Sequence, residues 1–152
     1  MKILDVLSKE AINLNMGARD KKGALEELVA PVAATTGASA EKLVKVLMER
    51  ERLGSTGIGG GVGIPHGKLK NLESLILGFG LSRQGVEFES MDGQPTHIFF
   101  LLLTPENSAG VHLILLARIS RLLKSSGFKE RLMKSKTPED ILEAIGEEDE
   151  DF

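Results

Sequence analysis

The residues with the clearest chemical potential lie at the end of a glycine-rich segment. Seven of the 17 glycines fall within residues 54–67, and the segment closes with Ile64-Pro65-His66-Gly67. Glycine allows unusual backbone dihedrals and lets backbone N–H groups approach an anion closely. Because neutral imidazole is a good nucleophile near neutral pH, a histidine between proline and glycine is suited to exposure and to contact with a transferring phosphoryl group.

Neither the glycines nor Pro-His-Gly identifies a site alone. Clustered glycines also form tight, irregular turns, and a lone histidine is more often a surface residue or a hydrogen-bonded core residue. Two nucleotide-binding motifs are excluded. A P-loop would need glycine at Val62 and a hydroxyl residue at Leu69, and the dinucleotide fingerprint would need glycine at His66.

His112 strengthens the interpretation of His66. Its helical stripe continues through Leu116 and Leu123, on the apolar face of a helix predicted over residues 109–124. His112 is therefore expected in the first turn, pointing inward, where the helix dipole favours the neutral ring. It could orient His66 or hydrogen-bond a phosphoryl oxygen. A core histidine bonded to a backbone carbonyl is the alternative.

The third histidine, His97, precedes an apolar strand and is interpreted as structural. Three histidines could also bind zinc, but none has a spacing such as H-x-x-x-H, and the chain has no cysteine. A Ser-His-Asp hydrolase is less favoured still, because G-x-S-x-G does not occur. We therefore predict no metal site.

Composition limits the class of protein. A length of 152 residues, with 41% apolar and 27% charged residues, is typical of one globular domain. The net charge is −3, five acids crowd into Glu147–Asp151, and the aromatic residues are six phenylalanines, so nucleic-acid binding is disfavoured. The longest apolar runs, 75–81 and 98–103, are too short for membrane insertion, and no signal peptide is recognisable. We expect a cytoplasmic protein.

The hydrophobic pattern predicts a single-domain α/β (α+β) fold with a mixed β-sheet flanked by helices on both faces. Strands are expected at 12–16, 75–81 and 98–103, and turns at Ser82–Gly85 and Asp92-Gly93. Within the second strand, Gly78 and Gly80 would let another element pack closely.

Four helices are expected from the spacing of apolar residues. The first follows Asp20 and is shortened by Pro31, and the second begins after an N-cap at Ser39 and stops at Gly54. The third covers 109–124. The last starts at Pro138 and ends at Gly146, which gives a domain of residues 1–146 and an acidic tail of residues 147–152.

The segment Glu51–Lys68 resembles the active-site signature of the enzyme IIA fructose/mannitol family of the bacterial phosphotransferase system. It is most similar to the nitrogen-regulatory branch, in which Gly-Ser-Thr-Gly-Ile-Gly and Ile-Pro-His-Gly-Lys recur almost in this form. His112 is similar to the second active-site histidine of the family. The resemblance covers nearly the whole chain. Two positions depart from it, because the branch often has asparagine at Gly60 and the family commonly has alanine at Gly63.

The resemblance implies a phosphohistidine carrier that needs no cofactor. His66 would accept a phosphoryl group on Nε2 from an HPr-type carrier, and His112 would contact that group or hold His66. Arg52 would offset the phosphate charge. Further binding groups would come from the signature itself: Ser55, Thr56, Gly57 and Gly67.

The resemblance also favours regulation over sugar transport. A phosphoryl group adds nearly two negative charges, so phosphorylated and unphosphorylated forms would bind regulatory target proteins differently. Two alternatives remain: a sugar-specific enzyme IIA that passes phosphate to a separate IIB, and a binding module that kept the fold and lost the chemistry. The oligomeric state is not indicated by the sequence.

Overall fold

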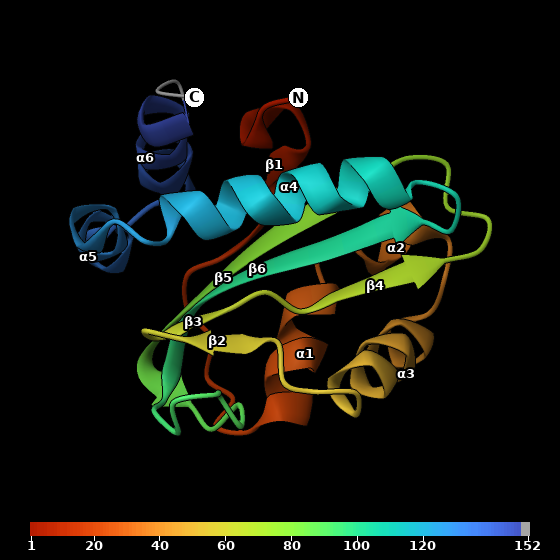
Figure 1. Ribbon diagram of the computed structural model, residues 1–152, viewed down its shortest axis with the longest axis horizontal. Helices are drawn as coiled ribbons and strands as arrows, with labels where there is room; N and C mark the ends of the chain where they lie inside the picture. The colour runs from red at the N-terminus through yellow and green to blue at the C-terminus, as the bar shows by residue number, and fades with distance from the viewer. Residues whose placement is uncertain (150–152) are drawn as a thin grey trace.

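The computed structural model describes residues 1–149, which form a six-stranded mixed sheet with helices on both faces (Figure 1). The strands follow the order β1-β5-β6-β3-β2, and β4 also pairs with β6. The strands are β1 (Leu7–Asn13), β2 (Gly57–Gly59), β3 (Val62–Gly63), β4 (His66–Leu69), β5 (Ile76–Val86) and β6 (Thr96–Pro105). The helices are η1 (Ile3–Asp5), α1 (Lys21–Val29), α2 (Ala33–Thr36), α3 (Ala40–Glu51), α4 (Ala109–Leu122), α5 (Ser126–Lys134) and α6 (Pro138–Asp149). The predicted fold class is confirmed.

Strand β6 is the centre of the sheet. It pairs antiparallel with β5 on one side and parallel with β3 and β4 on the other. Its residues Ile98–Leu103 are buried, as expected for a continuous apolar run covered on both faces. Helices α4, α5 and α6 lie on one side of the sheet, and α1 and α3 lie on the other (Figure 1).

Gly80 explains the close packing of α1 against β5. A Cβ atom built at Gly80 would lie 2.4 Å from Sδ of Met16 and 2.6 Å from a methyl group of Leu28 in α1. At Gly78 the nearest atom would be 3.4 Å away, an ordinary contact. The predicted close approach is therefore confirmed at Gly80.

Several predicted helix boundaries are confirmed. The Asp20 carboxylate accepts from the N–H of Gly23 at the start of α1, which ends two residues before Pro31. The Ser39 hydroxyl accepts from the N–H of Lys42 and caps α3. Gly54 follows that helix with φ 146°, a value that residues with a side chain rarely adopt.

Two predictions in the sheet are wrong. The first strand covers Leu7–Asn13 rather than 12–16, because the Asn13 side chain accepts from the N–H of Asn15 and turns the chain. The segment Ser82–Gly85 lies inside β5 instead of forming a turn between strands. Its turn residues produce a local shift in the register between β5 and β6, with the Ser82 hydroxyl accepting from the N–H of Gly85.

The C-terminal helices also differ from expectation. Helix α5 was not predicted, and α6 continues through Gly146 to Asp149. The helix continues because its last turn is buried: Asp149 is 1% exposed, forms an ion pair with Arg118 of α4 and accepts from the N–H of Ile3. Residues 147–149 of the predicted tail therefore belong to α6, and the remainder lies outside the described residues. Over 1–149, no helix has the length and apolar character needed to cross a membrane.

Candidate functional site

Strands β3 and β4 lie end to end beside β6 and position His66. The backbone hydrogen bonding to β6 continues across the break between the two strands, because the Pro65 carbonyl accepts from the N–H of Leu102 at 3.0 Å. Side chains alternate along a strand, so His66 faces α4 and Gly67 faces α3. A Cβ atom at Gly67 would lie 3.0 Å from Val46 of α3. Gly67 therefore allows α3 to pack against β4.

The imidazole of His66 is held by its own backbone segment. Its Nδ1 lies 2.7 Å from the Ile64 carbonyl oxygen. A carbonyl oxygen only accepts, so Nδ1 carries the proton in this hydrogen bond. In the neutral ring the lone pair is then on Nε2, which is the atom that can act as a nucleophile.

His112 lies against His66, as the sequence predicted. It comes from the first turn of α4 and is 6% exposed, and the two ring centroids are 5.1 Å apart with an interplanar angle of 66°. Nδ1 of His112 lies 2.9 Å from the hydroxyl of Thr104 in β6. Strand β4 and helix α4 thus bring together two histidines that are 46 positions apart in the sequence.

Both histidines line a cavity of about 540 Å³ between α3, α4 and β4. Two cationic side chains, Arg50 and Lys68, lie on its wall together with Glu49. The remaining side chains of the wall are apolar: Val46, Leu53, Leu113 and Leu116. Two of these, Leu53 and Leu113, are 84% and 65% exposed, so the cavity opens onto an apolar surface.

The surroundings favour the neutral form of both rings. Burial lowers the pKa of His66, the hydrogen bond to the Ile64 carbonyl opposes this, and the Arg50 guanidinium lowers the pKa further. Burial is also the main reason that the pKa of His112 falls to about 4, followed by the charge of His66 once that ring is protonated and by the charges of Lys68 and Arg50. At neutral pH the cavity therefore contains two neutral imidazoles beside two cations.

Arg52 lies elsewhere, and Arg50 takes the place predicted for it. Arg52 lines a separate cavity with Val44 and Met48, on the side of α3 that faces α1. Arg50 follows Val46 by four residues and so lies on the same helix face, whereas Arg52 is rotated by about 200° from it. The four-residue spacing from Val46 distinguishes the two arginines once the structure shows that Val46 faces β4.

Thr56 lies beneath the site and not on its wall. It is 4% exposed, its N–H donates to Oε1 of Glu51 at 3.0 Å, and its hydroxyl donates to Oε2. Glu51 is also paired with Lys21 of α1 at 3.0 Å, and both side chains are buried. The Thr56 carbonyl then accepts from the N–H of Ile64. This buried network anchors the segment whose carbonyl holds His66.

Ser55 and Gly57 also have internal partners. The Ser55 hydroxyl donates to the Phe88 carbonyl and accepts from the N–H of Gly57, each at 3.0 Å. A Cβ atom at Gly57 would lie 3.0 Å from Cα of Ser90. These residues shape the start of β2 and the turn that leads into it, and the wall of the histidine cavity does not include them.

His97 is separate from the other two histidines. Its Nδ1 lies 2.8 Å from the Ser82 carbonyl oxygen, and its ring borders a cavity beside α5. This backbone hydrogen bond is what a structural role requires. Among residues 1–149, no three histidine, aspartate or glutamate side chains gather as the ligands of a metal ion would.

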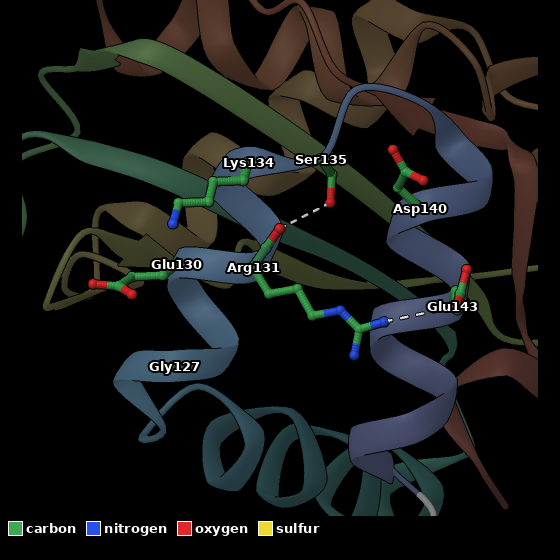
Figure 2. A pocket seen from close by; sticks show the side chains of 7 residues that line it. All are labelled: Gly127, Glu130, Arg131, Lys134, Ser135, Asp140 and Glu143. Atoms are coloured by element: carbon green, nitrogen blue, oxygen red, sulfur yellow. Dashed lines mark hydrogen bonds and ion pairs between the residues drawn. The ribbon is translucent and has the colours of Figure 1, made fainter.

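A polar cavity of about 390 Å³ lies between α5 and α6 (Figure 2). Figure 2 shows Arg131 of α5 pointing across it to Glu143 of α6, at 4.0 Å, and Arg131 also pairs with Glu147. The cavity is lined by three acids and two bases, so it has no surplus of positive charge for a phosphate. None of the predicted site residues lies in it.

Comparison with known proteins gives a consistent result. Residues 5–148 match the family described as phosphoenolpyruvate-dependent sugar phosphotransferase system, EIIA 2. The chain is 42% identical over 145 residues to a nitrogen regulatory protein of Bradyrhizobium diazoefficiens, with 95% of each chain covered. It is 33% identical to the fructose-specific EIIABC component of Bacillus subtilis over 98% of this chain and 24% of that one.

The fold is similar to solved structures as well. The crystal structure of the nitrogen regulatory protein IIA-Ntr from Neisseria meningitidis matches with a TM-score of 0.89 and 32% identity, over 93% of this chain and 97% of that chain. The enzyme IIA of the Escherichia coli mannitol system, solved in complex with phosphorylated enzyme IIB, has the same fold with a TM-score of 0.78 and 19% identity, over 93% of this chain and 99% of that chain. Family match, relatives and fold agree, and the chain belongs to the EIIA type 2 family of the phosphoenolpyruvate-dependent sugar phosphotransferase system, as a phosphotransfer component.

Proposed function

We propose that this protein carries a phosphoryl group on Nε2 of His66 and receives it from an HPr-type histidine phosphocarrier. The observation that supports this most directly is the hydrogen bond between Nδ1 of His66 and the Ile64 carbonyl. It leaves the Nε2 lone pair free, in a cavity that also contains Arg50, Lys68 and His112. The lowered pKa of His66 keeps that lone pair unprotonated at neutral pH.

In the transfer step, the bond between phosphorus and the donor histidine breaks while a bond from phosphorus to Nε2 of His66 forms. The donor nitrogen keeps the bonding pair as its lone pair. The proton on Nδ1 of His66 stays in place, donated to the Ile64 carbonyl, so the phosphorylated ring carries one positive charge beside the phosphoryl dianion. Such a transition state gains mostly from positioning and from charge stabilisation at the phosphoryl oxygens. Arg50, Lys68 and an N–H of His112 supply that stabilisation.

The predicted binding residues take different parts in this proposal. Arg50 acts in place of Arg52 as the guanidinium near the phosphoryl group. Ser55, Thr56 and Gly57 support the loop, and Gly67 supports the packing of β4.

Regulation through the phosphorylation state is the role we favour. The nitrogen regulatory protein of B. diazoefficiens aligns over 95% of both chains. The exposed apolar side chains Leu53 and Leu113 beside the cavity suit protein docking, and a new phosphoryl charge between them would change which target proteins bind. A sugar-specific enzyme IIA with a separate IIB is the second candidate, favoured by the 33% identity to the fructose-specific component.

The test is incorporation of phosphate from phosphoenolpyruvate in the presence of enzyme I and an HPr-type carrier, followed by intact mass. We expect one added phosphoryl group, removed by mild acid, in the wild type and in His97→Ala. We expect none in His66→Ala or His66→Gln, with circular dichroism unchanged. Labelling that persists in both His66 variants would refute the assignment.

A further inference from the structure

The hydroxyl of Thr104 has a single side-chain partner within residues 1–149. Thr104 is 0% exposed and lies in β6, on the face covered by α4. Its Oγ1 lies 2.9 Å from Nδ1 of His112, and no other hydrogen bond of this oxygen occurs in the described part of the chain. The position of the proton in this one hydrogen bond therefore decides the state of the His112 ring.

Only one of the two possible arrangements satisfies both groups. If Nδ1 of His112 donated to the hydroxyl, the hydroxyl proton of Thr104 would have no acceptor in a water-excluded position, which is costly. If the hydroxyl donates to Nδ1, its proton and the Nδ1 lone pair are both satisfied. The neutral ring then carries its own proton on Nε2, which is the nitrogen available to donate a hydrogen bond in the cavity.

We propose that Thr104 is a positioning residue, which donates its hydroxyl proton to Nδ1 of His112 and so holds that ring as the Nε2–H tautomer for donation to a phosphoryl group on His66. The effect on transfer rests on the proposed function, whereas the assignment of the tautomer does not.

The two histidines would then have complementary roles. His66 offers a lone pair at Nε2 because the Ile64 carbonyl holds its Nδ1–H, and His112 offers Nε2–H because a hydroxyl occupies its Nδ1. The opposite tautomer of His112 would place a lone pair against phosphoryl oxygens and repel them. The choice matters because His112, with a pKa of about 4, is neutral at neutral pH and has only one N–H.

The chain provides a matched control on the same strand. The hydroxyl of Thr96 in β6 is also buried and, among the described residues, has no hydrogen-bond partner. Thr96→Val removes a hydroxyl that is as buried as that of Thr104 and leaves His66 and His112 unchanged. Thr104→Val removes the proposed donor with little change in volume, and Thr104→Ser keeps it.

Nitrogen-15 NMR of the histidine rings in the unphosphorylated protein measures the tautomer directly. In the wild type we expect a protonated Nε2 and a hydrogen-bonded, unprotonated Nδ1 at His112. In Thr104→Val the Nδ1 signal should move to the position of a free ring nitrogen. The Nδ1–H population should rise about five- to tenfold, the bias that one hydrogen bond gives. Thr104→Ser and Thr96→Val should give the wild-type spectrum.

Phosphoryl transfer provides the second measurement. We expect the rate to fall in Thr104→Val in proportion to the Nε2–H population that the nitrogen signals show to be lost, and to stay near the wild-type rate in Thr104→Ser and Thr96→Val. A wild-type His112 protonated on Nδ1, or a Thr104→Val variant with unchanged nitrogen signals, would overturn the proposal. If neither the wild type nor any variant accepts a phosphoryl group, the proposed function fails. The nitrogen signals still decide the role of Thr104 in that case.

Discussion

The buried ion pair beneath the site leads to a prediction about stability. Glu51 is 6% exposed. Its carboxylate forms an ion pair with the Lys21 ammonium and accepts hydrogen bonds from the N–H and the hydroxyl of Thr56. Glu51→Gln keeps the size of the side chain but removes its charge. The Lys21 ammonium is then left with Glu89, 3.6 Å away and 75% exposed, as its remaining acidic neighbour in the described chain.

The magnitude follows from this burial. Breaking a buried pair by removing one partner lowers the free energy of unfolding by about 3–5 kcal/mol, because the other charge stays desolvated. In a domain of this size that corresponds to a fall in Tm of about 10 °C. Glu89→Gln is the matched control, because it removes the exposed carboxylate on the same lysine and should lower the free energy by less than about 1 kcal/mol.

Urea denaturation of the wild type, of the single variants Glu51→Gln, Glu89→Gln and Lys21→Met, and of the double variant Lys21→Met/Glu51→Gln measures these differences. We expect the double variant to be more stable than Glu51→Gln, because the uncompensated ammonium is gone. A Glu51→Gln variant as stable as Glu89→Gln would refute the reasoning. So would a double variant whose loss equals the sum of the separate losses of Lys21→Met and Glu51→Gln.

Two further predictions concern the cavity. Arg50→Gln should slow phosphoryl transfer at least about tenfold while Arg52→Gln leaves it within about twofold, measured as the rate of label uptake; equal rates in both variants would contradict the placement of Arg50. Because the pKa of His112 is about 4 in the folded protein and 6.5 otherwise, the unfolded chain binds the proton more readily between those values. The stability that His112 contributes is therefore present above about pH 6.5 and is lost as pH falls toward 4, and urea midpoints should depend less on pH in His112→Gln than in the wild type.

The two histidines could be predicted from the sequence because each had a local signal. His66 stands in a glycine-rich segment, and His112 continues an apolar helical stripe. The arginine was assigned by resemblance alone, and neighbouring positions on a helix point in different directions. Thr104 and Glu51 had no local signal, since their partners come from other elements and only the folded chain brings them together.

The errors in the fold have the same origin. Ser82 and Gly85 have the residue types of a turn, but pairing with β6 extends the strand through them and leaves only a shift in register. Gly146 has the residue type of a helix end, but contacts of Asp149 with Ile3 and Arg118 keep the last turn in place. Local propensity is weak compared with such long-range contacts.

The alternation of His66 and Gly67 along β4 has a consequence for the length of this segment. Insertion or deletion of one residue between Val62 and His66 would turn every following side chain to the other face of the sheet. The imidazole would then meet Val46 of α3, and glycine would face the cavity. A side chain would then replace Gly67 where a Cβ atom already comes within 3.0 Å of Val46, so the packing of α3 against β4 would be lost together with the site. A chain with every residue of the signature would then lack its nucleophile, because the site depends on the odd or even number of residues that precede the histidine in the strand.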